Sequence, residues 1–78
     1  MARKDAEYYF ERGLAKVELQ QYEEAIKDYD KSIEINPNYA NAYINRGVSK
    51  TELKRYEEAI KDYDKAIEID PNLSLIHI

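Results

Sequence analysis

Residues 22–38 read YEEAIKDYDKSIEINPN, and residues 56–72 read YEEAIKDYDKAIEIDPN. The two stretches are offset by 34 residues and agree at 15 of 17 positions, which is far more than chance allows. The preceding segments repeat at the same offset, in the matched pairs Ala6/Ala40, Tyr9/Tyr43, Arg12/Arg46, Gly13/Gly47, Lys16/Lys50, Glu18/Glu52 and Leu19/Leu53. A fixed period of this length indicates a repeat protein, in which each unit packs on its neighbour.

Each unit contains two helical patterns separated by a short break. The first pattern places four residues on one face at spacings of three and four: Tyr9, Gly13, Lys16 and Leu19. The second pattern has an apolar stripe made of Tyr22, Ala25, Ile26, Tyr29, Ser32 and Ile33, which recurs as Tyr56, Ala59, Ile60, Tyr63, Ala66 and Ile67. We therefore predict an all-α fold with helices over residues 5–19, 22–36, 39–53 and 56–70.

Glycine and proline predict where the helices approach closely and where they end. A glycine inside a helix costs about 1 kcal/mol relative to alanine, so Gly13 and Gly47 predict close approach of the second helix of each unit. Pro37 is expected to end the second helix of the first unit, because proline disfavours helical geometry in the residue before it. Asn38 follows Pro37 and is expected to cap the next helix.

Together these features resemble the tetratricopeptide repeat, a helix–turn–helix unit with this period. The matching residues are Tyr9, Gly13, Tyr22, Ala25, Tyr29 and Pro37, then Tyr43, Gly47, Tyr56, Ala59, Tyr63 and Pro71. The resemblance covers residues 6–72 and implies an α-solenoid of antiparallel helical hairpins, a fragment of a right-handed superhelix. It divides the chain into an N-terminal extension (1–5), a first repeat (6–39), a second repeat (40–72) and a tail (73–78).

One departure from the family pattern occurs in both units. Arg12 and Arg46 stand where the family often has leucine. Because Arg12 and Asp28 recur together as Arg46 and Asp62, we predict that each arginine is partly buried and pairs with the aspartate of its own hairpin.

The two units differ mainly on one side of their first helices. In the first unit these residues are Glu7, Phe10, Leu14 and Val17. In the second unit they are Asn41, Ile44, Val48 and Thr51, with Asn45 beside them. Their spacing places each set on one helix face. In the tetratricopeptide family the first helices line a concave surface across which peptides lie, so the resemblance predicts that these residues, here called the concave face, bind a partner.

The composition of the concave face indicates what kind of partner it fits. Its centre is apolar, and Glu7, Glu11 and Glu52 make its edge mildly acidic. A helix or extended segment with two or three apolar anchors and some lysine or arginine would suit it. The alternative is that these residues serve packing, and that the chain is a structural spacer whose hairpins stack or self-associate without a ligand. The carboxylate clamp of chaperone-binding relatives is rejected, because Phe10 and Leu14 stand at its lysine and asparagine positions.

Several other functions are disfavoured by composition. The net charge of −4 argues against nucleic-acid binding. There is no cysteine, and His77 is the only histidine, so we expect no enzyme, no metal site and no cofactor. The carboxylates of the second helices alternate with lysines, as on a solvated, ion-paired face. No apolar run reaches the roughly 20 residues of a membrane span, and no signal peptide is recognisable, so the cytoplasm is the default location.

The tail interrupts the repeat. Residues 73–78 read LSLIHI and resemble translated sequencing-adaptor DNA, so we expect them to be non-native and the chain to be a fragment of a longer scaffold. Without a further repeat, Tyr63, Ile67 and part of Ile60 should be exposed on the last hairpin. Leu73, Leu75 and Ile76 could cover that side. Otherwise we predict self-association through the uncapped hairpin at high protein concentration.

Overall fold

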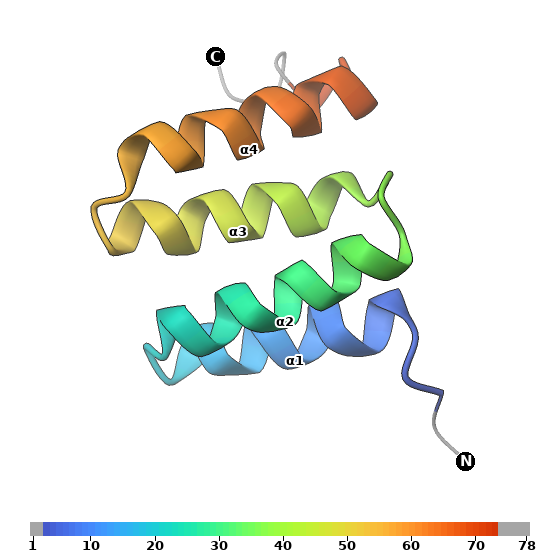
Figure 1. The fold of residues 1–78 in the computed structure, drawn as a ribbon, viewed down its shortest axis with the longest axis vertical. Helices are drawn as coiled ribbons and strands as arrows, with labels where there is room; N and C mark the ends of the chain where they lie inside the picture. Colours follow the sequence, from blue (N-terminus) through green and yellow to red (C-terminus); the bar gives the residue numbers. More distant parts are fainter. Residues whose placement is uncertain (1–2, 74–78) are drawn as a thin grey trace.

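The computed structural model describes residues 3–73, which form two antiparallel helical hairpins stacked side by side (Figure 1). The first hairpin consists of α1 (Ala6–Glu18) and α2 (Tyr22–Ile35), and the second consists of α3 (Ala40–Glu52) and α4 (Tyr56–Ile69). Every helix ends within one residue of its predicted position, so the prediction of an all-α hairpin repeat is confirmed. The expectations for Leu75, Ile76 and His77 concern residues outside the described part of the chain.

The core runs through α2, which packs against α1 on one side and α3 on the other. The predicted stripe of α2 supplies most of it, and its most buried members are Ala25, Ile26, Tyr29 and Ser32. From α3, Ala42 and Ser49 are fully buried, so the two hairpins meet through small side chains. Ser32 replaces the usual alanine because its hydroxyl donates to the Ala6 carbonyl oxygen (2.7 Å), which ties α2 to the start of α1.

Both glycines lie where a tyrosine ring crosses the first helix of the hairpin. A Cβ atom on Gly13 would lie 2.5 Å from Cε1 of Tyr29, and one on Gly47 would lie 2.8 Å from Cε1 of Tyr63. Both distances are below any real carbon–carbon contact. The predicted close approach is therefore confirmed, and it explains why glycine is used in the middle of both helices.

The two hairpin turns use a backbone conformation that the sequence does not indicate. Gln20 and Lys54, which are equivalent residues, have φ angles of 58° and 63°. Glycine or asparagine is usual at such a left-handed position after a helix. The turn is closed in the first hairpin by the Gln21 amide, which donates to the Lys16 carbonyl oxygen (2.9 Å).

The prediction that Asn38 caps α3 is wrong. Tyr39 occupies the capping position, and no side chain there accepts a hydrogen bond from the helix. Instead, Asn36 Oδ1 accepts a hydrogen bond from the Asn38 amide (3.1 Å) and folds the chain around Pro37. Asparagine side chains stabilise turns in this way as readily as they cap helices, so residue type alone does not separate the two roles.

The hydroxyl of the central tyrosine has a partner in only one hairpin. In the second, Tyr63 Oη lies 3.3 Å from Thr51 Oγ1, which itself donates to the Gly47 carbonyl oxygen (2.9 Å). In the first, Val17 occupies the position of Thr51, and Tyr29 Oη is buried with no hydrogen-bond partner among residues 3–73. Burial, and then the charge of Asp28, raise the pKa of Tyr29 to about 12.

Replacing Val17 with threonine is expected to raise the free energy of unfolding by about 0.5–1 kcal/mol, because the new hydroxyl can accept from Tyr29 as Thr51 accepts from Tyr63. Urea denaturation measures the change. The control is the same substitution in a Tyr29→Phe background, where no gain is expected. Equal destabilisation in both backgrounds would show that the missing partner does not matter.

Candidate partner-binding face

The two hairpins are locked by arginine–aspartate pairs, as predicted. Arg12 Nη2 lies 2.8 Å from Asp28 Oδ1, and Arg46 Nη2 lies 2.7 Å from Asp62 Oδ1. The expectation of partial burial holds well for Arg46, whose side chain is 17% exposed, but less for Arg12, at 47%. Arg46 is more buried because it also contacts Asp30 of α2, whereas Arg12 lies over the rings of Tyr8 and Tyr9 on its own helix and contacts no helix of a neighbouring repeat among residues 3–73.

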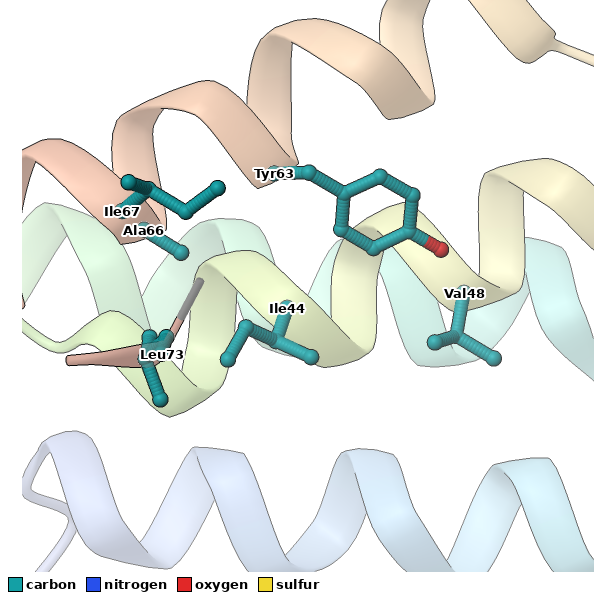
Figure 2. Close-up of a pocket in the computed structure, with 6 residues that line it drawn as sticks. All are labelled: Ile44, Val48, Tyr63, Ala66, Ile67 and Leu73. Atoms are coloured by element: carbon teal, nitrogen blue, oxygen red, sulfur yellow. The ribbon is translucent and has the colours of Figure 1, made fainter. Parts of the chain in front are cut away.

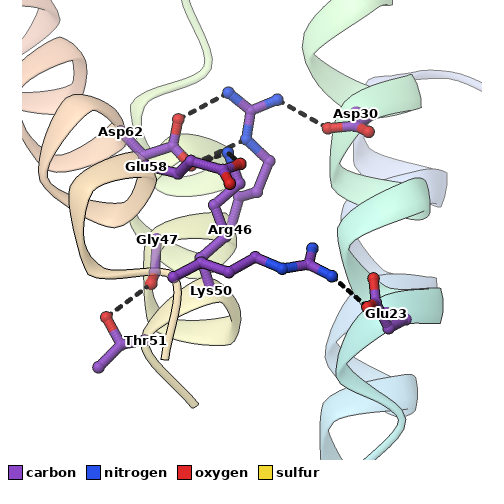
Figure 3. A network of polar contacts seen from close by, with 9 residues as sticks. Glu23, Asp30, Arg46, Gly47, Lys50, Thr51, Glu58 and Asp62 are labelled. Atoms are coloured by element: carbon purple, nitrogen blue, oxygen red, sulfur yellow. Dashed lines mark hydrogen bonds and ion pairs between the residues drawn. The ribbon is translucent and has the colours of Figure 1, made fainter. Parts of the chain in front are cut away.

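Arg46 also joins the two repeats (Figure 3). Its Nη1 donates to Asp30 Oδ1 on α2 (2.7 Å), while Nε and Nη2 donate to Asp62 on α4. Burial alone would lower the pKa of Arg46, but the hydrogen bonds to Asp62 and Asp30 outweigh it and the pKa is raised. Arg55 makes a second pair across the hairpins, with Glu23. These contacts fix how α3 lies against the first hairpin, and so where its other side chains point.

The residues of the concave face differ in how much side chain they leave accessible. Leu14 and Val48 are 38% and 41% exposed, which is high for apolar residues on packed helices. The exposed polar members are Glu7 and Asn41. The half-buried members are Phe10, Val17, Ile44, Asn45 and Thr51.

Phe10 is a floor for this surface and is not sealed inside the hairpin. Its ring centroid lies 5.9 Å from that of Tyr29 and 5.1 Å from that of Tyr39, the residue before α3. Burial raises the pKa of Tyr39, and the nearby charges of Glu7 and Glu11 raise it further. An aromatic pair edged by carboxylates therefore joins the two first helices. Tyr39 was not among the predicted site residues, although it directly precedes the helix that carries Asn41 and Ile44.

Two members of the concave face already make hydrogen bonds within the second hairpin. Asn45 Nδ2 donates to the Asn41 carbonyl oxygen (2.8 Å). Thr51 makes the hydrogen bonds to Gly47 and Tyr63 described above. Both side chains are thus less available to a partner than sequence alone indicates, since the helix backbone competes for their polar atoms.

A cavity of about 370 Å³ opens beside this surface, between α3 and α4 (Figure 2). It is lined by Ile44, Val48, Tyr63, Ala66, Ile67 and Leu73. Ile44 and Val48 were predicted site residues, but the contribution of α4 was not predicted. The contribution of α4 could have been predicted from the repeat, because the α4 residues that line the cavity are equivalent to residues of the buried stripe of α2.

Residues 3–73 include no group of three or more histidine or acidic side chains placed to hold a metal ion. Within the same residues, no helix is both long and apolar enough to cross a membrane.

Two sequence profiles of the same family match the chain. A tetratricopeptide repeat profile matches residues 40–73, and a second profile, described as TPR repeat, matches residues 13–53. The chain therefore belongs to the tetratricopeptide repeat family. Repeats of this family generally mediate protein–protein interaction and typically form non-catalytic scaffolds. No curated protein sequence matches the chain.

Solved structures share the fold. The TPR domain of Arabidopsis OM64 is 34% identical, with a TM-score of 0.85 over 87% of this chain and 56% of that one. A crystal structure of MamA is 29% identical, with a TM-score of 0.82 over 88% of this chain and 40% of that one. A second MamA structure is 27% identical, with a TM-score of 0.79 over 94% of this chain and 40% of that one. The chain thus spans about half the length of these structures or less.

Proposed function

We propose that the concave face binds a peptide or helix of a partner protein that carries two or three apolar anchors and at least one lysine or arginine. Support comes above all from Leu14 and Val48, which expose about two-fifths of their surface on neighbouring first helices. Apolar side chains grouped on one surface favour cover by another molecule. The contact between the rings of Phe10 and Tyr39 adds apolar surface near the starts of the two first helices.

Charge favours a basic partner. Glu7 and Glu11 are exposed on α1 on either side of Phe10 in the sequence, and their charges add to burial in raising the pKa of Tyr39. Both are exposed and have no ion-pair partner among the described residues. A lysine or arginine beside an apolar anchor would therefore gain electrostatic attraction at the edge of the site, where charges set specificity more than affinity.

The test is selection of binders from a displayed library of random peptides against the full chain, followed by measurement of affinity for variants. Selected peptides are expected to combine apolar residues with lysine or arginine. The double variant Leu14→Gln, Val48→Gln should weaken binding by about tenfold or more, since two anchors lose apolar contact. The matched control is Leu19→Gln, Ile35→Gln, which alters two exposed apolar residues outside the face and should change affinity less than about twofold.

Equal weakening by both double variants, with unchanged thermal midpoints, would reject the concave face as the binding site. Selection of acidic peptides would reject the charge preference.

A second candidate function is stacking of helices without a peptide ligand, and one observation favours it. Ile60 and Ile67 of α4 are 56% and 37% exposed, so the last hairpin presents an apolar side on which another helix, or another copy of the chain, can pack. The predicted exposure of these two residues is confirmed, whereas Tyr63 is half-buried. A polar residue at Leu14 separates the two uses, because Leu14 lies on α1, which makes no contact with α4, so the substitution weakens peptide binding and leaves stacking through α4 intact.

A further inference from the structure

The cavity between α3 and α4 has a filled counterpart in the first repeat. The residues equivalent to its lining are Phe10, Leu14, Tyr29, Ser32, Ile33 and Tyr39. Among them, the Phe10 ring lies against two tyrosine rings, with its centroid 5.9 Å from that of Tyr29 and 5.1 Å from that of Tyr39. Tyr29 is fully buried, whereas its equivalent Tyr63 is only half-buried. The first repeat thus packs three aromatic rings where the second has a space of about 370 Å³.

Side-chain size explains this space. Two of the lining positions carry the same residue in both repeats, as the pairs Tyr29/Tyr63 and Ile33/Ile67. At every other lining position the second repeat has the smaller side chain. These pairs are Phe10/Ile44, Leu14/Val48, Ser32/Ala66 and Tyr39/Leu73. All of these differences lie within residues 3–73, so the missing volume is a property of the second repeat itself.

The missing volume is that of an aromatic ring. Ile44 and Leu73 stand where the first repeat has the two rings that pack together over Tyr29. In Figure 2, Tyr63 extends from α4 towards Val48, and Leu73 lies beside Ile44 at the other end of the cavity. An apolar cavity of about 150 Å³ already holds a benzene ring. The cavity here is larger, so it has room for a ring together with the methylene group that joins it to a peptide backbone.

The cavity walls favour a phenyl ring over a phenol. Tyr63 carries the one polar side-chain group among the lining residues, and its hydroxyl already lies 3.3 Å from Thr51 Oγ1. A hydroxyl on the ligand would therefore leave water without a ready partner, which is unfavourable. A phenyl ring has no such group, and a tilted contact with the Tyr63 ring would stabilise it beyond the burial of its area.

We infer that this space, here called the ring cavity, binds the phenyl ring of a phenylalanine on the partner peptide. The ring packs against Tyr63 as Phe10 packs against Tyr29. This assignment rests on the proposed function, because Ile44 and Val48 belong to both the concave face and the ring cavity. One apolar anchor of the partner therefore enters between α3 and α4, while the others lie over Leu14.

The first probe is toluene, added to the full chain with isotope-labelled methyl groups. Saturable shifts are expected at Val48, Ile67 and Leu73, with a dissociation constant in the millimolar range. Ile44→Phe restores the side chain of the first repeat and should abolish these shifts by filling the cavity. Ile35→Phe is the matched control, because it makes the same change at an exposed position of α2 outside the cavity, and it should leave toluene binding unchanged.

A second filling variant, Leu73→Tyr, restores the other ring of the first repeat. It should also abolish toluene binding. The thermal midpoints of both filled chains are expected to equal or exceed that of the parent chain, because each variant uses packing that the first repeat already contains. Should Ile44→Phe fail to fold, the comparison of Leu73→Tyr with the parent chain decides.

The second measurement uses peptides selected for binding to the full chain. These are expected to carry phenylalanine at one position. Replacing it with alanine should weaken binding to the parent chain at least about tenfold, but binding to the Ile44→Phe chain by less than about threefold. The smaller loss is expected because the filled cavity no longer accepts the ring.

Failure of the ring cavity and failure of the proposed function give different results. The ring cavity is overturned if toluene at saturation shifts none of the lining methyl groups, or if Ile44→Phe and Ile35→Phe affect its binding equally. It is also overturned if selected peptides bind through Leu14 without any preference for phenylalanine. The proposed function stands in each of these cases. Toluene binding that Ile44→Phe removes, with no peptide bound at Leu14 or Val48, would instead overturn the proposed function and support the ring cavity alone.

Discussion

Replacing Gly13 with alanine is expected to lower the free energy of unfolding by about 2 kcal/mol. The added methyl would lie 2.5 Å from Cε1 and 2.9 Å from both Cδ1 and Cζ of Tyr29. That ring is fully buried and lies against Phe10, so it has no free space to move into. Overpacking of this kind costs about 3 kcal/mol, and the better helix propensity of alanine offsets about 1 kcal/mol of it.

Gly47→Ala is the matched control, since it makes the same change in the same repeat position. Its methyl would lie 2.8 Å from Cε1 of Tyr63, and that ring is only half-buried beside an open cavity. The ring can shift, so the cost should be clearly smaller. Urea midpoints of the two variants provide the comparison. A stabilised Gly13→Ala chain, as helix propensity alone would predict, would contradict the close approach described here.

Asp62→Asn is the second substitution with a large expected effect, a loss of about 2–3 kcal/mol. The Asp62 side chain is 5% exposed and neutralises two nearby cations, Arg46 and Lys50, which are 17% and 12% exposed. Removing its charge leaves these cations close together and poorly solvated. The expected loss stays below the largest values for buried pairs, because Arg46 keeps its contact with Asp30.

The equivalent substitution Asp28→Asn is expected to cost less. Its partner Arg12 has a side chain that is 47% exposed and can turn to water when the carboxylate is lost. Denaturation of both variants at low and high salt gives the comparison, and the Asp62 variant should show the larger loss at each. Equal losses would mean that the cover provided by α2 does not strengthen the pair in the second repeat.

The repeat itself explains why so much of the fold was predictable. Two copies in register fix the period of the repeat. The positions of the helix ends and the Arg12–Asp28 pair could therefore be predicted, because the residues that indicate them occur twice. The unequal burial of the two arginines was not predicted. Among residues 3–73 only Arg46 also contacts the other repeat, through Asp30, and a comparison of the two repeat sequences does not show this difference.

Local backbone chemistry was the other source of error. Asn38 has a residue type suited to capping. However, the side chain of Asn36 forms the turn by accepting from the Asn38 amide, and Tyr39 occupies the capping position of α3. Gln20 takes a left-handed conformation that its residue type does not predict, because the geometry of the hairpin imposes it. At the concave face, the sequence identified the exposed apolar residues but not Tyr39, whose ring reaches Phe10 only once the hairpins stack.

The most direct measurement is an amide chemical-shift map of the full chain titrated with a peptide selected for binding. The largest changes are predicted at Phe10, Leu14, Ile44 and Val48, on the two first helices, with little change at Lys27 and Lys61 on the second helices. Changes confined to α2 and α4, with Leu14 and Val48 unaffected at saturation, would contradict partner binding by the concave face.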